Sequence, residues 1–333
     1  MKSGVPRRKN VVESEEPASG FSWWYLLFPL LSSIFYTLAN TCMRQVAGGG
    51  ASIPVAIAMR ESVAFYVALP IFLWQFRRGK AVLPPWRLIF LFFLTSLGVQ
   101  IFGNIFLQQA FRDVGMAASV AGSWTGSLLG APLLAWLWLH ERISKRVFFS
   151  IGLVFLALFF LTSGARLQEC SIHSATLPVS GWFSNPIAVR TILLTVLSGV
   201  IFSASNCVIR KMGKEQSSLW LPMVILPGTG FLVLTFLDGW EHGLESYRTF
   251  TRHDILFAYL AGFANILAFF SLIMGLRRLK VVQVSIVNVS QLAFAPLIGY
   301  FLFHEPMNVP ILAGIFLVMT AIIISNTSTK LRS

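Results

Sequence analysis

The sequence predicts an all-α polytopic membrane protein with ten transmembrane helices in two inverted five-helix repeats. Three observations lead to this fold class: the composition, ten long apolar segments and an internal repeat. Of the 333 residues, 56% are hydrophobic and 12% are charged, and the mean hydropathy is +0.72. Soluble domains are about half apolar and a quarter charged. So few charges could not cover the apolar surface of a soluble fold of this length, whereas a lipid bilayer would.

The formal net charge of +13 would by itself suggest a nucleic-acid partner. The basic residues instead occur in short clusters between apolar segments, which is typical of the cytoplasmic loops of membrane proteins. We therefore expect the chain to lie in a lipid bilayer and to have no nucleic-acid partner. The three cysteines show no metal-ligand spacing, and their odd number argues against a disulfide framework.

Ten segments are apolar over about the length that a spanning helix needs, roughly 17–25 residues. They are expected to be helices because lipid offers no partner to backbone amides. A barrel would instead need short alternating strands. In chain order the segments lie at 22–43, 53–74, 86–108, 114–139, 147–162, 188–209, 219–237, 255–275, 281–303 and 309–325.

Most connectors between these segments are short, and one long connector divides the segments five and five. This division predicts five regions. They are a disordered cytoplasmic tail at 1–21, a first five-helix repeat at 22–163, a non-cytoplasmic connecting loop at 164–187, a second five-helix repeat at 188–326 and a cytoplasmic tail at 327–333.

The distribution of Lys and Arg predicts the orientation. With the N-terminus inside, 19 basic residues fall on the cytoplasmic side and six on the other, which is a strong positive-inside bias. Both termini are then cytoplasmic. We expect an integral, multi-pass protein, and a bacterial inner membrane or a plasma membrane is the simplest setting.

The two halves repeat one another. The end of the fourth segment reads APLLAWLWLHE (131–141), and the end of the ninth reads APLIGYFLFHE (295–305). In the first and sixth segments, Asn40 and Arg44 match Asn206 and Arg210. Because each half has an odd number of segments, the second half enters the membrane from the opposite side. Such inverted repeats are typical of transporters that open a central site to each side in turn.

On these features the chain resembles the EamA-type transporters of the drug/metabolite transporter superfamily over nearly its whole length. The likeness rests on the five-plus-five arrangement, on the paired Pro…His-Glu ends of segments four and nine, and on Pro54 with Arg60 in segment two. Segment seven has no Arg that matches Arg60, which is a departure from an exact repeat. The resemblance implies a solute carrier, often an exporter of amino acids, metabolites or amphipathic compounds, and it does not imply one substrate.

Polar residues inside spans are costly, so each is a candidate for function. Arg60 and Glu61 form an adjacent ionisable pair in segment two. We expect Arg60 to neutralise an anionic group of the substrate and Glu61 to carry a coupling proton. Adjacent residues of a helix point about 100° apart, which predicts different partners for the two side chains. The alternative is that they fix helix contacts or lie near the interface.

Carboxamides supply most of the other candidates. Gln100, Asn104 and Gln108 are four residues apart and form one polar stripe, which is expected to face a cavity or a neighbouring helix. The predicted substrate-binding set is Arg60, Gln100, Asn104, Asn265, Asn40, Asn206, Asn288, Gln291 and Trp124. For Asn40 and Asn206 a contact across the repeat axis is an equal alternative. Ser and Thr in segments four and nine are assigned to helix packing.

Pro132 and Pro296 match in the repeat and are the hinge candidates, because proline interrupts helical hydrogen bonding. His140-Glu141 and His304-Glu305 end their segments near opposite faces of the membrane and cannot meet. They are therefore interpreted as helix ends rather than as a metal or acid/base site.

No catalytic motif is recognisable: the chain shows no P-loop, zinc helix or nucleophile elbow. We expect no catalytic residues, no metal and no cofactor. The sequence therefore predicts a secondary transporter that moves a small metabolite, amino acid or drug-like solute by alternating access, in the direction of export. The alternatives are a channel or lipid scramblase, and an intramembrane enzyme or receptor-like module. Whether the chain forms a homodimer stays open.

Overall fold

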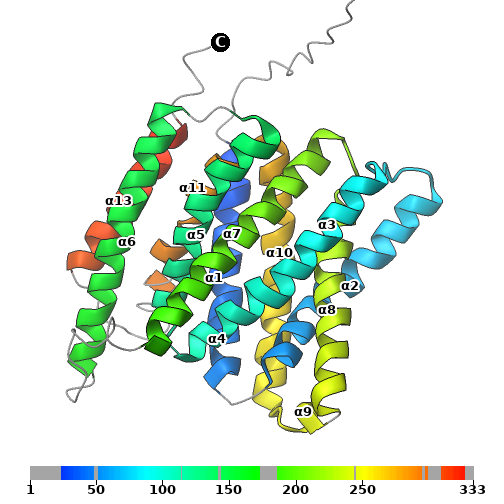
Figure 1. The fold of residues 1–333 in the computed structure, drawn as a ribbon, viewed down its shortest axis with the longest axis horizontal. Coiled ribbons are helices and arrows are strands. Elements are labelled where there is room, and N and C mark those ends of the chain that lie inside the picture. Colours follow the sequence, from blue (N-terminus) through cyan, green and yellow to red (C-terminus); the bar gives the residue numbers. More distant parts are fainter. Residues whose placement is uncertain are drawn as a thin grey trace, which may run out of the picture.

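The structure, a computed structural model, describes residues 24–48, 52–113, 115–141, 144–172, 186–243, 245–294, 297–298 and 309–326. All regular secondary structure in these ranges is helical, as the sequence predicts. The helices stand side by side in one bundle (Figure 1). Their bounds are α1 Trp24–Gly48, α2 Ile53–Arg77, α3 Trp86–Gly98, η1 Val99–Asn104, α4 Ile105–Asp113, α5 Gly115–Leu139, α6 Lys145–Ile172, α7 Pro186–Lys214, α8 Trp220–His242, α9 Glu245–Arg248, α10 Arg252–Arg278, α11 Val281–Asn288 and α13 Val309–Asn326.

Each of the ten predicted segments overlaps a helix of the described chain. Seven of the helices that the structure describes are long and apolar enough to cross a membrane, and they coincide with predicted segments one to four and six to eight. The chain is therefore all-helical in its described part and has several candidate spans. The count of ten spans and the inverted orientation of the halves remain predictions.

The long connector differs from the prediction of a loop over 164–187. Helix α6 continues to Ile172, and α7 already begins at Pro186. The sequence Thr-Ser-Gly-Ala at 162–165 resembles the end of an apolar segment, but these residues allow the helix to continue. Residues 173–185 lie outside the described part of the chain, as do the hinge candidate Pro296 and the pair His304-Glu305.

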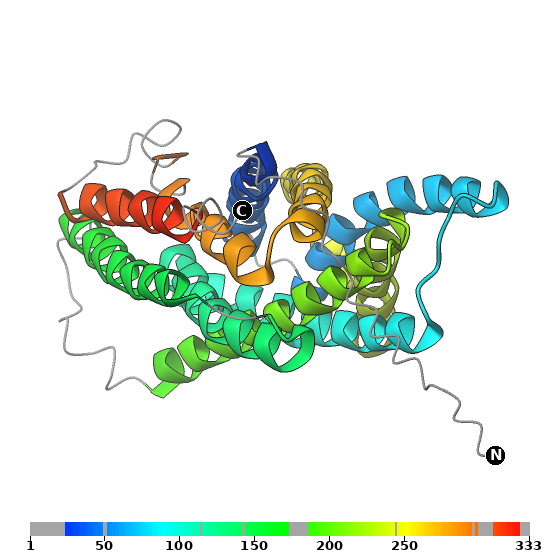
Figure 2. The same cartoon turned by 90° about the horizontal axis from the view of Figure 1, so that it is seen from above.

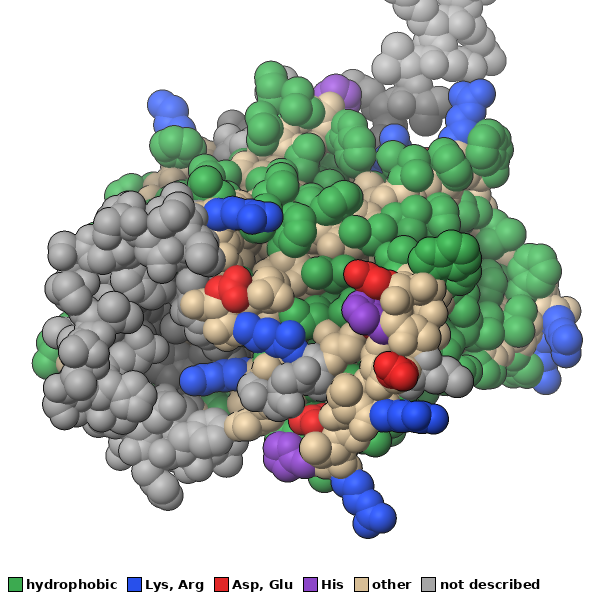
Figure 3. Space-filling model, turned by 60° about the horizontal axis from the view of Figure 1, so that its bottom comes forward, with side chains coloured by type: hydrophobic (Ala, Val, Ile, Leu, Met, Phe, Trp, Pro, Cys, Tyr) green, Lys and Arg blue, Asp and Glu red, His purple; other side chains and the backbone are tan. Residues whose placement is uncertain are grey.

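The outer surface fits a bilayer. Large hydrophobic side chains stand exposed along the flanks of the helices, among them Trp136, Phe148, Phe236 and Phe316. Monomeric soluble proteins rarely expose such continuous apolar surface. Figure 3 shows that charged side chains instead gather at the end of the bundle where α9 lies, while hydrophobic side chains cover the sides.

Four helix pairs form most of the packing: α5 with α7, α1 with α10, α6 with α13, and α2 with α8. Seen from above, α6 and α13 lie at one end of an elongated cross-section, and α2, α3 and α8 lie at the other (Figure 2). The first and second halves of the chain are thus interleaved rather than stacked as separate domains. Helices α1, α5, α7 and α10 lie between these two ends (Figure 2). Among them, α1 packs against α10, α5 against α7, and α7 against α10.

Helices α5 and α7 approach each other unusually closely through glycine. A Cβ atom at Gly126 would lie 1.8 Å from the carbonyl oxygen of Val196, and one at Gly199 would lie 1.8 Å from that of Ser123. Real side chains cannot occupy such positions, so the two backbones are in direct contact. Small residues serve this purpose in membrane helices, where the lipid removes the hydrophobic drive for association.

Replacing Gly126 by Ala is expected to force α5 and α7 apart and to lower the free energy of unfolding by about 1–3 kcal/mol. Gly152→Ala is the matched control, because a Cβ atom at Gly152 meets nothing within 4 Å. That control should leave stability unchanged or raise it by up to about 1 kcal/mol. Thermal unfolding of the purified protein in detergent measures both variants, and equal stability of the two would contradict the close contact.

Candidate functional site

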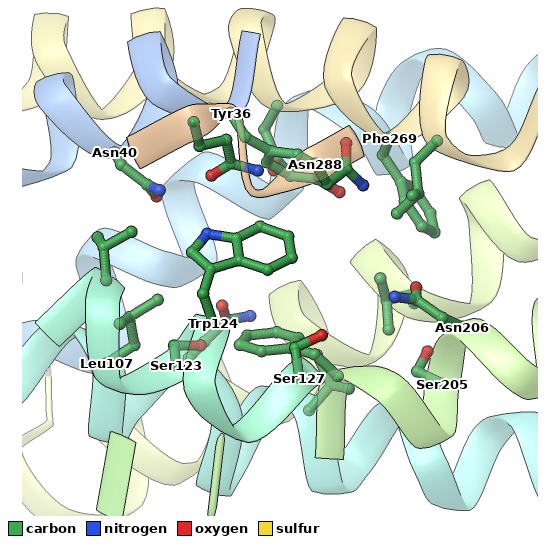
Figure 4. Close-up of a pocket in the computed structure, with 18 of the residues that line it drawn as sticks. Tyr36, Asn40, Leu107, Ser123, Trp124, Ser127, Ser205, Asn206, Phe269 and Asn288 are labelled. Atoms are coloured by element: carbon green, nitrogen blue, oxygen red, sulfur yellow. The ribbon is translucent and has the colours of Figure 1, made fainter. Parts of the chain in front are cut away.

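A cavity of about 130 Å³ lies between the helices of both halves. It is reached by side chains from α1, α2, the continuous segment α3–η1–α4, and α5 in the first half, and from α7, α8, α10 and α11 in the second. Of the described residues in α6 and α13, none lines it. Figure 4 shows the cavity walls, with Trp124 standing between Asn40 and Asn288 on one side and Ser123 and Ser127 on the other.

Most of the predicted site residues come together here. The residues of the predicted set that line the cavity are Arg60, Glu61, Asn40, Asn104, Trp124, Asn206, Asn265, Asn288 and Gln291. In the sequence they are spread from Asn40 to Gln291, so only the tertiary fold places them on one surface. Their function in binding remains a prediction, because proximity alone does not test it.

Gln100 belongs to the predicted set, but it lies behind the cavity wall. Its side chain is fully buried, and its Nε2 donates to the carbonyl oxygen of Leu226 at 2.9 Å. Its Oε1 accepts from Nδ2 of Asn104 at 2.7 Å. Gln100 therefore orients Asn104, which lines the cavity, instead of facing it. Gln108, further along the same stripe, donates to the carbonyl oxygen of Met43 at 2.9 Å and joins α4 to α1.

The helix that carries Gln100, Asn104 and Gln108 is not a regular α-helix over its whole length. Val99–Asn104 form the π-helix η1 between α3 and α4. A π-helical turn is wider than an α-turn and is frequent at functional sites. A Cβ atom at Gly103 in this turn would lie 3.3 Å from the ring of Phe202, so η1 and α7 meet closely beside the cavity.

Arg60 and Glu61 bind one another, which corrects the prediction of separate partners. Nε of Arg60 donates to Oε1 of Glu61 at 3.1 Å, and Nη2 donates to the same oxygen at 2.5 Å. Both side chains are buried, at 9% and 3% exposed. The directions of adjacent Cβ atoms do diverge, but the long arginine side chain folds back far enough to reach the carboxylate. A buried charge is stable only with such a partner.

The other carboxylate oxygen is also occupied. Oε2 of Glu61 accepts from Nδ2 of Asn265 in α10, at a long 3.4 Å. The approach of α8 is possible because Gly230 carries no side chain: a Cβ atom there would lie 2.8 Å from Cγ of Glu61 and 2.6 Å from Cδ of Gln100. The ion pair is therefore enclosed by α8 and α10 of the second half, although both charges belong to the first.

The remaining polar wall is made of carboxamides and hydroxyls. Asn288 is buried, and its Oδ1 has no hydrogen-bond partner in the described structure. A buried polar atom without a partner is uncommon and calls for an explanation. Among the cavity-lining residues, this oxygen is an acceptor that a bound molecule could satisfy.

Sequence reasoning missed the aromatic part of the wall. Tyr36, Phe202 and Phe269 line the cavity together with the predicted Trp124. Ser123 and Ser127 also line it, in addition to the helix packing predicted for them. A usable signal exists for two of the aromatics: Tyr36 and Phe202 each stand four residues before the repeat-matched Asn40 and Asn206.

The lining residues fall largely into pairs that are 164–166 positions apart in the chain. The pairs are Tyr36 with Phe202, Asn40 with Asn206, Arg60 with Leu226, Asn104 with Phe269, Leu107 with Leu272, Trp124 with Asn288, and Ser127 with Gln291. These separations agree with the sequence repeat, in which Asn40 matches Asn206. Corresponding positions of the two halves therefore line the same cavity.

Glu141 has a structural role beyond the end of its helix. The segment does end there: His140 has a φ of 52°, and α5 stops at Leu139. Its carboxylate also lies 3.4 Å from Nε of Arg210 and 3.7 Å from Nζ of Lys214 in α7. Arg210 in turn donates to the carbonyl oxygen of Leu276 at 2.8 Å, which ties α5, α7 and α10 together at one end of the bundle.

The remaining predictions concern a hinge proline and the metal-binding side chains. Pro132 lies inside α5, as a hinge candidate should, but its movement is a prediction. In the described ranges, no group of three or more His, Cys, Asp or Glu side chains is placed to hold a metal ion. Cys42 and Cys207 are free thiols.

A double-mutant cycle tests the pairing of Arg60 with Glu61. Arg60→Met alone leaves a buried carboxylate without its partner and should lower the free energy of unfolding by about 3–5 kcal/mol. Arg60→Met/Glu61→Met should recover most of this loss, because an apolar pair replaces both charges. Thermal unfolding gives the three values, with exposed Arg44→Met as the control. Additive losses in the double variant would show that the two side chains stabilise separate contacts.

Comparison with known proteins finds similarity to one transporter family. The model of the EamA-like transporter family matches residues 189–327, which lie in the second half of the chain. An uncharacterized transporter of Bacillus subtilis (strain 168), YvbV, is 24% identical over 236 residues, which cover 68% of this chain and 70% of the relative. These matches confirm the resemblance to the EamA-type transporters.

The fold has a counterpart among solved structures. One chain, titled only as the crystal structure of a protein, aligns with a TM-score of 0.65 at 14% identity, over 93% of this chain and 99% of its own length. At this identity the match shows a shared fold and nothing about activity. Residues 189–327 thus match the EamA-like transporter family, and the chain, with several helices long and apolar enough to cross a membrane, is similar to EamA-type transporters.

Proposed function

We propose that the chain is a secondary carrier that moves a small solute by alternating access, with the described cavity as its solute site. The observation that carries this proposal is the lining of one cavity by matched positions of both halves. In an inverted-repeat carrier the site lies at the interface of the repeats, where either half can close over it. A binding protein or an enzyme has no need for this arrangement.

The helix contacts support an inverted repeat. If a two-fold axis relates the halves, a contact between two helices should recur between their counterparts. Helix α1 packs against α10, and α7 likewise packs against α3, η1 and α4, while α2 packs against its own counterpart α8 and α6 against α13. The contact of α5 with α7 should have a counterpart between α1 and the segment of α11. At the first contact stand Gly126 and Gly199; at the matching positions of the second, Oγ of Ser290 and Oγ of Ser33 lie 2.7 Å apart.

The ends of the bundle supply the moving contacts in this proposal. By the positive-inside rule, the ion pairs of Glu141 with Arg210 and Lys214 lie on the cytoplasmic side. Lys214 is 45% exposed, whereas the side chains of Glu141 and Arg210 are largely buried, and together they link the end of α5 to α7. Pro132 stands nine residues before Glu141 in α5, where a bend would swing this end of the helix.

Within the cavity, the solute contacts fall to Arg60, Trp124, Asn40, Asn104, Asn206, Asn265, Asn288 and Gln291. Glu61 is the candidate for proton coupling. Its partners Arg60 and Asn265 come from the two halves, so a rearrangement between the halves would change its environment. We place both termini in the cytoplasm of a bacterial inner membrane or plasma membrane, with export as the direction.

A channel or a lipid scramblase is the alternative, and kinetics separates it from a carrier. A carrier saturates and shows counterflow, in which unlabelled solute on one side drives labelled solute across from the other. A channel does neither. Non-saturating flux without counterflow would therefore remove the carrier proposal.

Cysteine labelling tests two-sided access without a known solute. In a background with Cys42, Cys170 and Cys207 replaced by serine, Asn40→Cys in the cavity should react with a membrane-impermeant thiol reagent from either side of oriented vesicles. Ser96→Cys is the matched control: Ser96 is fully buried in α3 and does not line the cavity, so it should react from neither side. Labelling of the cavity cysteine from one side only, under every condition, would contradict alternating access.

Proton coupling makes a separate prediction. A pH gradient should drive flux of an identified solute into proteoliposomes, and Glu61→Gln should abolish this drive while counterflow persists, because counterflow needs no net proton movement. Exposed Glu245→Gln in α9 is the control. A gradient response that survives in Glu61→Gln would exclude Glu61 as the coupling group.

A further inference from the structure

We infer that the cavity takes an uncharged solute with a single planar ring and an amide-type edge that donates at least one N–H hydrogen bond. This inference rests on the proposed function, since it assigns a chemical class to the solute of the same site. It combines the charge of the lining, one unsatisfied acceptor and the shape of the aromatic wall.

The charge of the lining comes first. Arg60 and Glu61 are the only charged residues among those that line the cavity in the described chain, and each is the partner of the other. Glu61 accepts from Arg60 and, at a long 3.4 Å, from Asn265. An ammonium group would therefore meet a carboxylate whose charge Arg60 already balances. A carboxylate would have to draw Arg60 away from Glu61 and leave that buried anion unpaired, which is costly.

The hydrogen-bonding groups point to a neutral donor. Asn288 lines the cavity, and its buried Oδ1 lacks a partner in the described structure, so a turn of this side chain toward the cavity would let it accept an N–H or O–H of the solute. A carboxylate has only acceptors and would meet this oxygen with repulsion. The other carboxamides of the wall, on Asn40, Asn206 and Gln291, each present a donor and an acceptor. An amide edge, which also presents both, is their natural complement.

The shape of the wall selects a ring. Aromatic side chains of Tyr36, Trp124, Phe202 and Phe269 surround the space, and planar rings stack on such faces. A cavity of about 150 Å³ in another protein accommodates benzene, so about 130 Å³ gives room for one ring.

Matched positions of the two halves differ in polarity along the cavity wall. Where the first half has Arg60 and Asn104, the matching positions of the second half have Leu226 and Phe269. At the pair Trp124 and Asn288 the order is reversed, so each half contributes both polar and apolar positions to the wall. A ring with one polar edge can satisfy both kinds of position at once, whereas a solute that is polar all round cannot.

Ring compounds of similar size that differ in charge and in hydrogen-bonding groups test the inference. Benzamide, benzoate and benzylammonium, and likewise nicotinamide and nicotinate, are compared by thermal shift of the purified full chain at pH 7, since a bound ligand raises the unfolding temperature. The two amides should protect at concentrations at which their charged isosteres do not. Asn288→Ala should weaken amide binding about tenfold, which is the effect of one lost hydrogen bond. Asn206→Ala is the second variant if Asn288→Ala does not fold.

Glu61→Gln gives the converse result. It frees Arg60, so benzoate and nicotinate should gain affinity by about tenfold or more relative to the amides. Gln109→Ala, an exposed carboxamide of α4 that does not line the cavity, is the matched control and should change neither preference.

Three outcomes would overturn the inference. Charged isosteres could protect as well as the amides and lose this protection in Asn288→Ala, which would refute neutrality but leave the cavity as the solute site. Amide protection could persist in both cavity variants, which would place the ligand elsewhere. Finally, none of the compounds could protect. In each case, two-sided labelling of Asn40→Cys tests separately whether the cavity opens to both sides, and counterflow decides between a carrier and a channel.

Discussion

Lipid offers no hydrogen bond, and this constraint accounts for the polar contacts inside the bundle. Backbone groups satisfy one another in helices, and hydroxyl side chains bond back to carbonyl oxygens of the preceding turn, as Thr37 does to Ser33 and Thr41 to Thr37. Longer polar side chains reach a neighbouring helix: Gln108 reaches α1, and Gln100 reaches α8. The charges of Arg60 and Glu61 are stable in this setting because they pair. Polar groups therefore join helices here where a soluble core would use apolar side chains.

The same constraint makes close backbone contact valuable. Apolar surface gains little by leaving lipid, so helices associate through packing and through small residues. Gly126 and Gly199 bring α5 and α7 into direct contact, and the hydroxyls of Ser127 and Ser203 add a hydrogen bond at 3.0 Å beside them. A contact this close has little freedom to slide. We therefore expect α5 and α7 to stay together at this glycine contact, with motion at the end of the pair, where the longer side chains of Glu141 and Arg210 meet.

A repeat that lines a cavity twice starts from equivalent walls, and the two halves of this chain have diverged in chemistry. Asn40 and its match Asn206 are still the same residue. Arg60, in contrast, is matched by Leu226, and both line the cavity. Trp124 has Asn288 as its counterpart. Two walls that differ in this way can recognise a molecule with a polar and an apolar side, while the shared backbone arrangement retains the capacity of either half to move. The helix arrangement that the two halves share and the side chains that select the solute therefore depend on different residues of the repeat.

Composition and apolar length are sufficient to predict helices, their approximate bounds and the membrane, because the bilayer imposes these properties on each segment independently. The repeat at 131–141 and 295–305, and the match of Asn40 with Asn206, likewise indicate the family and most of the cavity residues without any geometry. Other features depend on contacts between segments. Gln100 lies behind the wall because η1 departs from regular α-helical geometry, and Glu61 binds Arg60 because α8 and α10 enclose them both. Periodicity along one helix reports which residues share a face, but only the packing of the other helices decides what that face meets.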